Sequence, residues 1–91
     1  MKRSIGFDPK AKKDLQTAYD YYEAQQVGLG EDFLIEIDES LGLLLSYPFA
    51  FPNKYKNLRE YAVPRFPFLI YYEVTDTQLR ILSIFHTSRN K

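Results

Sequence analysis

Two stretches of the chain carry apolar residues at the spacing of an amphipathic helix. In the first, Ala11, Leu15, Ala18 and Tyr22 recur at steps of four, three and four, with charged and amide residues between them. This period gathers the apolar side chains on one face of a helix. Pro9 suits the first helical position, and Asp8 before it is expected to accept hydrogen bonds from the first free amides. The pattern predicts a helix over residues 9–25.

The second stretch predicts a longer helix with a broad apolar stripe. Its apolar positions are Phe33, Leu34, Ile37, Leu41, Leu44 and Leu45. The helix is expected to begin near Glu31 and Asp32, because acidic residues favour the positive end of a helix. It should end before Pro48, because the residue preceding a proline avoids helical backbone. The segment QQVGLGED, residues 25–32, offers two glycines for a tight reversal, so the helices should form an antiparallel hairpin.

Four β-type runs flank the helical pair. RSIGF, residues 3–7, precedes the first helix, and three further runs cover residues 58–63, 68–74 and 79–86. The short polar link TDTQ, residues 75–78, indicates a hairpin between the last two runs. YPFAFPNKYKN, residues 47–57, reads as an ordered loop, stiffened by two prolines and held by its aromatic side chains. The predicted fold is one α+β domain over residues 1–91, in the order β-α-α-β-β-β, with the helical hairpin on one face of a small, mainly antiparallel sheet.

Apolar residues occupy both faces of the last two predicted strands. Strict alternation places Leu69 and Tyr71 of one strand on the face away from Ile70 and Tyr72. In the next strand, the same alternation groups two apolar side chains with two basic ones on one face: Arg80, Leu82, Ile84 and His86. One helical hairpin can cover only one face of a sheet. Either these are central strands with a partly apolar outer face, or the second face binds a partner, as large exposed apolar surfaces on small proteins usually do.

Composition removes several classes of function. The 91 residues include no Cys and a single His, so thiolate zinc sites, disulfide frameworks and a Cys nucleophile are excluded, and no metal or cofactor is expected. No run of about 18 apolar residues could span a membrane, and MKRSIGFDPK turns polar too early for a signal peptide. The cytoplasm is the expected location, with no membrane partner.

The zero net charge hides a segregation along the chain. Residues 1–13 hold five basic residues and one acidic residue, residues 14–53 hold eight acidic residues and no Lys or Arg, and residues 54–91 hold seven basic and three acidic residues. If the middle segment forms its own face, the molecule has an acidic side and a basic side. The alternative is two ordinary solvated faces.

The basic residues of the last third are the candidates for chemistry. Metal-independent RNA cleavage needs a base for the 2′-hydroxyl, a cation for the phosphorane charge and an acid for the leaving group. Arg59, Arg65, His86 and Arg89 are the residues that could supply these roles. The other interpretation is that His86 packs at a strand end or contacts a partner, and that Arg80 serves solubility.

The strand and hairpin FPFLIYYEVTD and the closing ILSIFHTSRN, together with the order of elements, resemble the RelE/ParE superfamily of type II toxins, or plasmid stabilisation proteins. The similarity runs from FDPKAKKDLQTAYDYYE to HTSRN. It implies a toxin that arrests bacterial growth and is neutralised by a cognate antitoxin, whose extended and helical segment wraps the toxin. The antitoxin would then cover the second sheet face, with contacts at Leu69, Tyr71, Leu82 and Ile84.

The superfamily contains ribosome-dependent mRNA endonucleases of the RelE kind and ParE-like inhibitors of DNA gyrase. This chain has Leu69 where such nucleases usually carry an arginine, lacks their closing tyrosine, and has a sequence pI near 6.6, low for a protein that lies among ribosomal phosphates. These departures favour the ParE-like branch, a gyrase inhibitor with no enzymatic activity. The mRNA endonuclease, with ribosome and mRNA as partners, is the alternative, and an inactive antitoxin-bound regulator is a third reading.

For the gyrase inhibitor, the expected target contacts are basic residues of the last third of the chain: Arg59, Arg65, Arg80, His86 and Arg89. For the nuclease, Arg59, Arg65, His86 and Arg89 would be the functional positions. Dimerisation of the isolated chain through its apolar face is left open.

Overall fold

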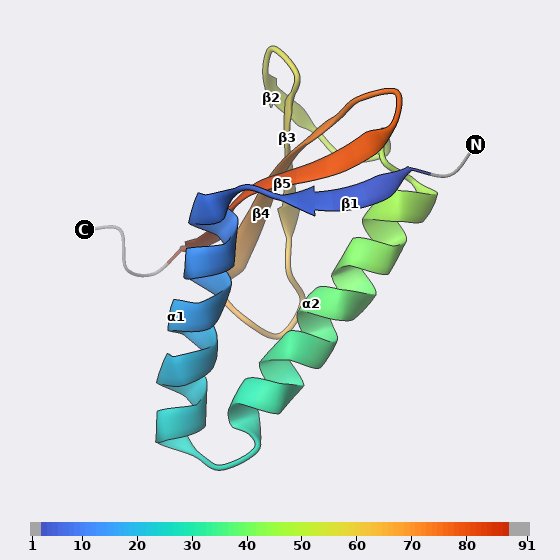
Figure 1. Cartoon of the computed structure of the whole chain (residues 1–91). Helices are drawn as coiled ribbons and strands as arrows, with labels where there is room; N and C mark the ends of the chain where they lie inside the picture. The colour runs from blue at the N-terminus through green and yellow to red at the C-terminus, as the bar shows by residue number, and fades with distance from the viewer. Residues whose placement is uncertain (1–2, 88–91) are drawn as a thin grey trace.

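The computed structural model describes residues 3–87 as two helices and five strands in the order β-α-α-β-β-β-β (Figure 1). The elements are β1 (Ser4–Phe7), α1 (Pro9–Gln25), α2 (Leu29–Ser46), β2 (Asn53–Tyr55), β3 (Leu58–Ala62), β4 (Phe68–Val74) and β5 (Gln78–His86). The predicted helices, helical hairpin and three long strands are confirmed. The prediction for residues 47–57 is wrong in part, because Asn53–Tyr55 forms a short fifth strand in what reads as a loop.

The five strands form one mixed sheet in the order β1-β5-β4-β3-β2. β1 runs parallel to β5, with Phe7 opposite Ile81, while every other pair is antiparallel. The tight turn after Tyr55 brings the chain back and pairs β2 with β3. No apolar alternation marks β2 in the sequence, because all three of its residues are exposed. β5 therefore lies inside the sheet between the first strand of the chain and β4.

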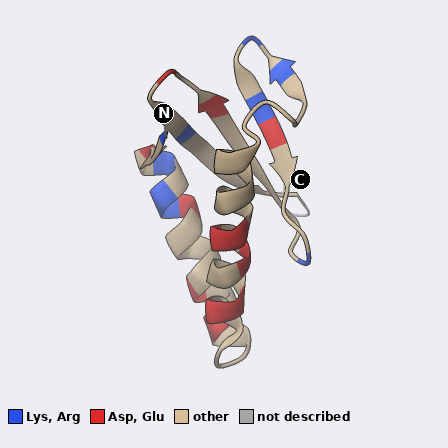
Figure 2. Ribbon diagram, turned by 90° about the vertical axis from the view of Figure 1, so that its right-hand side faces the viewer, with Lys and Arg blue, Asp and Glu red and all other residues tan. Residues whose placement is uncertain are grey.

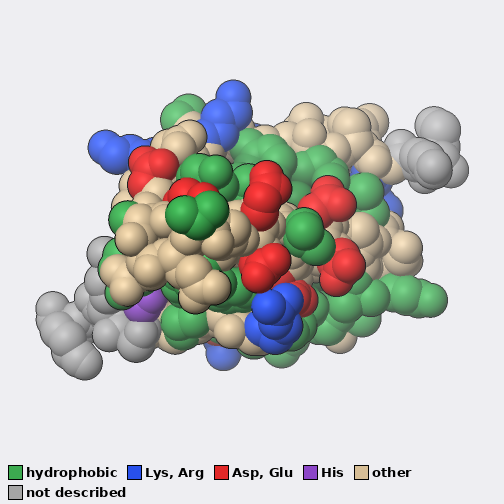
Figure 3. Space-filling model, turned by 90° about the horizontal axis from the view of Figure 1, so that it is seen from below, with side chains coloured by type: hydrophobic (Ala, Val, Ile, Leu, Met, Phe, Trp, Pro, Cys, Tyr) green, Lys and Arg blue, Asp and Glu red, His purple; other side chains and the backbone are tan. Residues whose placement is uncertain are grey.

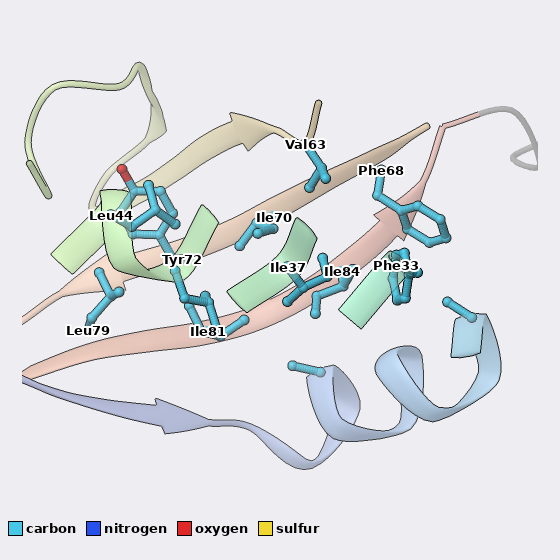
Figure 4. Packing of buried hydrophobic residues seen from close by; sticks show 13 residues of the cluster. Phe33, Ile37, Leu44, Val63, Phe68, Ile70, Tyr72, Leu79, Ile81 and Ile84 are labelled. Atoms are coloured by element: carbon cyan, nitrogen blue, oxygen red, sulfur yellow. The ribbon is translucent and has the colours of Figure 1, made fainter. Parts of the chain in front are cut away.

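Both helices lie on the same side of the sheet and leave the other side open (Figure 1). Figure 4 shows side chains of α2, among them Ile37 and Leu44, facing the side chains of β4 and β5, among them Ile70, Tyr72 and Ile84. Burial of such side chains is the main driving force of folding. Thirteen buried side chains from both helices and the sheet form one continuous cluster.

α1 also covers the edge of β5 that β1 does not reach. The carboxylate of Asp14 accepts hydrogen bonds from the Ile84 amide at 2.9 Å and the Ser83 hydroxyl at 3.2 Å, and it pairs with Lys10. A strand edge exposes unpaired amides that must find acceptors or water. Asp14 thus fixes the helix against the final strand.

The turn between the helices is stabilised by a carboxylate of the first helix. Gly28 takes the left-handed conformation, with φ of 92°, that the two-glycine segment suggested. The Glu23 carboxylate accepts hydrogen bonds from the amides of Gly28 and Gly30 at 3.0 and 2.9 Å, so it caps the N-terminus of α2. A Cβ at Gly30 would lie 2.7 Å from the Tyr19 ring, which explains the glycine there.

Asp8 does not cap the first helix through its side chain, contrary to the prediction. The residue stands at the N-cap with extended backbone, but no amide of the helix donates to its carboxylate. The carboxylate instead pairs with Arg80 on β5. A neighbouring cation outcompetes the capping geometry, and the pair joins the start of α1 to the sheet.

The acidic middle of the sequence is gathered on the helical hairpin. Figure 2 shows acidic positions along α2, and basic positions on the first turns of α1 and on the β2–β3 hairpin. Figure 3 views the molecule from the end where α1 turns into α2. It shows acidic side chains with apolar ones among them. The acidic residues of the middle segment therefore share the helical hairpin, whereas the basic residues are distributed over several elements and form no single opposite face. Among residues 3–87, neither helix combines the length and apolar character needed to cross a membrane.

Candidate partner-binding surfaces

The open face of the sheet carries a mixed apolar and charged surface. Strand pairing aligns Leu69 of β4 with Ala62 and Phe85, and Tyr71 with Glu60, all on the side away from the helices. The Tyr71 and Phe85 rings contact edge to face, with centroids 6.4 Å apart. These side chains are mostly half-buried within this chain, so part of their apolar area remains exposed to solvent.

A β-bulge in β5 overturns part of the predicted face. Ser83 lies opposite Tyr71 and Ile81 lies opposite Tyr72, so Leu82 is an extra residue and the alternation reverses after it. Ile84 therefore lies on the helix side and is only 2% exposed. The prediction that Ile84 belongs to the open face is wrong, and Phe85 occupies that face instead.

Tyr71 lies in a polar corner of the open face. Partial burial raises the pKa of its hydroxyl, and the negative charge of Glu60 raises that pKa further, while Lys54 acts in the opposite direction. Glu60 in turn pairs with Lys54 at 3.3 Å. The neutral phenol is therefore favoured, and it can serve as a hydrogen-bond donor to Glu60 or to a partner.

The three predicted arginines that the structure describes do not form one site. Arg80 lies on the open face and pairs with Asp8 and Glu73. Arg59 lies on the opposite face and donates to the backbone carbonyl oxygens of Phe51 at 2.8 Å and Phe49 at 3.4 Å. Each guanidinium is thus engaged by its own chain.

Arg65 and His86 lie at the same end of the sheet. Arg65 sits in the β3–β4 loop with a positive φ of 71° and pairs with Glu36 of α2 at 3.1 Å. The loop is joined to the end of β5, where the Thr87 amide donates to the Pro67 carbonyl oxygen. Arg89 lies outside the described residues.

His86 faces the helix side, so the prediction that it shares a face with Arg80 and Leu82 is wrong. It lies opposite Phe68, and the two rings meet edge to face with centroids 4.8 Å apart. The half-buried imidazole lines a groove of about 440 Å³ between α1 and the end of β5. Lys10, Lys13 and Asp14 line the same groove, a neighbourhood that the sequence pattern did not reveal.

Within residues 3–87, no group of three or more His, Cys, Asp or Glu side chains is arranged to hold a metal ion. The described surface therefore offers apolar, basic and acidic contact areas, and its candidate basic residues are dispersed over two faces and both ends of the sheet.

Comparison with protein families matches residues 5–91 to a model described as the ParE toxin of the type II toxin-antitoxin system parDE. The chain belongs to this ParE toxin family. It is thus a ParE-like member of the RelE/ParE superfamily and the toxin component of a type II toxin-antitoxin system, as the resemblance predicted. Comparison with curated protein sequences gives no match.

Solved structures share the fold of this ParE family member. A structure described as the chromosomal ParDE TA system from P. aeruginosa has a TM-score of 0.80 and 23% identity, covering 92% of this chain and 95% of that one. The E. coli DinJ-YafQ toxin-antitoxin complex has a TM-score of 0.69 and 16% identity, covering 99% and 98%. YafQ from E. coli strain BL21(DE3) has a TM-score of 0.66 and 17% identity, covering 94% of both chains. At these identities the likeness shows a common fold.

Proposed function

We propose that this chain is a one-domain toxin that acts in the cytoplasm by binding DNA gyrase, without chemistry of its own, and that a cognate antitoxin neutralises it. The observation that carries the proposal is the dispersal of its basic residues. Groups of the same chain bind each of the guanidinium groups of Arg59, Arg65 and Arg80. None of the three is therefore left unpaired to stabilise the charge of a transition state.

Distances along the sheet argue against the alternative ribonuclease. Arg59 lies opposite Tyr72 and His86 lies opposite Phe68, four residues apart on β4. At about 3.3 Å per residue, the two positions are offset by roughly 13 Å along the strands, and β4 lies between their two strands. A base and a charge-stabilising cation must both come within about 3 Å of the reacting atoms, which this spacing does not favour.

The open face is the proposed antitoxin site. Leu69, Tyr71 and Leu82 keep their predicted role, and Phe85 replaces Ile84. In the DinJ-YafQ complex, a toxin of this fold is bound by its antitoxin, which supports an antitoxin partner here. Replacing Phe85 by Ser is expected to weaken binding of the co-expressed antitoxin at least ten-fold, whereas the matched change Tyr21→Ser on α1 should not.

The proposed gyrase contacts are the basic residues at one end of the sheet, Arg65 and His86, together with Arg89, which follows three positions later in the sequence. Arg65 stays 59% exposed in its side chain despite its ion pair, so it remains accessible to a partner. Arg59 and Arg80, also expected as contacts, are proposed to act mainly by holding the fold.

The test uses purified chain, DNA gyrase, relaxed plasmid and ATP. Inhibition of supercoiling is the expected result, and the double change Arg65→Gln with His86→Gln should raise the inhibitory concentration about ten-fold, while Lys12→Gln on α1 should not. A parallel translation reaction should leave mRNA intact. Cleaved mRNA with unimpaired supercoiling would replace the gyrase proposal by the nuclease. In cells, thymidine uptake should fall before amino acid uptake.

A further inference from the structure

The loop between α2 and β2 is held firmly from behind. The buried Tyr72 hydroxyl donates to the Pro48 carbonyl oxygen at 3.0 Å, and Arg59 donates to the Phe51 carbonyl oxygen at 2.8 Å. The Phe51 ring packs edge to face on Tyr61, with centroids 4.9 Å apart. Side chains of two sheet strands thus fix the backbone of a surface loop, which predefines the direction of its other side chains.

Three large aromatic rings on this loop and the following hairpin point into solvent. Tyr47 is 61% exposed, Phe49 is 58% exposed and Tyr55 is 66% exposed. They fall within nine consecutive positions, although aromatic side chains usually bury most of their surface. Neither the helices nor the sheet cover these rings. The loop and the hairpin therefore hold three aromatic side chains that are not part of the hydrophobic core.

Cations lie beside two of these rings, Phe49 and Tyr55. The Arg3 and Arg59 guanidinium groups lie 5.4 and 5.1 Å from the centre of the Phe49 ring, and the Lys56 ammonium lies 5.4 Å from that of Tyr55. A chain of this length averages about one strong cation–π contact, so three around two rings mark a concentration. Figure 2 shows basic positions on the β2–β3 hairpin, away from the acidic turns of α2.

The tip of the β2–β3 hairpin holds a lysine in an unfavourable conformation. Lys56 has a φ of 53°, in the left-handed region where Gly or Asn is more stable. Lys54, two residues earlier, is not part of this group, because it pairs with Glu60 on the open face at 3.3 Å. A strained backbone that carries an exposed ammonium at a tip is a feature of binding sites.

We propose that this aromatic–basic patch, comprising Arg3, Tyr47, Phe49, Tyr55 and Lys56, binds single-stranded nucleic acid. Unpaired bases stack on exposed rings, and phosphates meet the interleaved cations. Duplex DNA offers the same phosphates but keeps its bases stacked on each other. An acidic peptide would satisfy the cations and leave the rings without planar partners. The patch is separate from the proposed gyrase contacts at Arg65 and His86, so this inference stands or falls independently of the gyrase proposal.

Fluorescence anisotropy with a labelled 20-mer of thymidylate tests the proposal on the full chain. Binding in the micromolar range at low salt is expected, weaker for a duplex of the same length and absent for a poly-glutamate peptide. Tyr55→Ser should weaken binding about ten-fold, and the matched change Tyr21→Ser on exposed α1 surface should not.

The tip lysine is tested through the salt dependence. Lys56→Gln should reduce the slope of log affinity against log salt by about 0.7, while Lys12→Gln should leave the slope unchanged. Circular dichroism confirms that each variant is folded. No binding of the 20-mer, equal binding of the duplex, an unaffected Tyr55 variant, or binding of poly-glutamate alone would each overturn the proposal, the last in favour of an acidic protein partner.

Discussion

The carboxylate that caps α2 gives the sharpest stability prediction. Glu23 accepts two amide hydrogen bonds, from Gly28 and Gly30, at the positive end of a helix of 18 residues. Loss of a capping side chain costs about 0.5–2 kcal/mol, and the favourable contact of a carboxylate with the helix dipole contributes about 0.3–1 kcal/mol. Because Glu23 is half-buried and makes both bonds, Glu23→Ala should lower the free energy of unfolding by about 2 kcal/mol.

Urea unfolding followed by circular dichroism measures this change, and thermal unfolding should show a midpoint lower by about 10 °C for a chain of this size. Glu23→Gln keeps one acceptor oxygen and should lose about half as much. Glu39→Ala, an exposed change in the middle of the capped helix α2, should stay within about 0.5 kcal/mol of the parent. Amide exchange should accelerate at Gly28 and Gly30 in the Ala variant. Unchanged exchange there, or equal losses for Glu23→Ala and Glu39→Ala, would refute the capping role.

Three further changes probe the core and its pH dependence. Ile84→Ala should cost about 2–5 kcal/mol in urea unfolding because the side chain is 2% exposed, while Phe85→Ala should cost about 1 kcal/mol; the reverse order would contradict the bulge. Burial raises the pKa of Tyr72 above the ordinary 10.0, so its contribution to stability is fully present below pH 10 and is lost as the pH rises through the pKa of the folded state. Tyr72→Phe should flatten this alkaline loss of stability. An unchanged pH profile in the variant would count against this role of Tyr72. Gly30→Ala should destabilise because its Cβ meets the Tyr19 ring at 2.7 Å, a result checked by the thermal midpoint, which a stabilised variant would contradict.

Local patterns predicted the helices and the long strands because their signals lie within a few residues of each other. The spacing of Ala11, Leu15 and Ala18 and the proline at position 9 define α1 without any knowledge of its neighbours. The parallel pairing of β1 with β5 has no such signal, since its partners lie at opposite ends of the chain. Asp8 shows the same limit, because the arginine that takes its carboxylate lies 72 positions away.

The candidate site was less predictable than the fold. The sequence names basic and apolar candidates, but the faces that they occupy depend on a bulge at Leu82 that only the register with β4 reveals. One extra residue exchanged Ile84 for Phe85 on the open face and turned His86 towards α1. Ser83, a polar residue inside an apolar run, is the one local sign that alternation breaks there, and Asp14 explains its polarity.

The position of β5 between β1 and β4 bears on how the toxin matures during translation. β1 is synthesised first, yet its partner lies more than 70 residues later, a delay of roughly 4–14 s at ordinary rates of elongation. The helical hairpin can form locally in that interval, whereas the sheet must wait for a late, long-range pairing, which slows folding. Ribosome-bound chains that stop before residue 78 should therefore be protease-sensitive. Chains long enough for residues up to 87 to have left the ribosome should be protected. A nascent toxin therefore has no complete open face, and an antitoxin has a defined moment at which it can first bind.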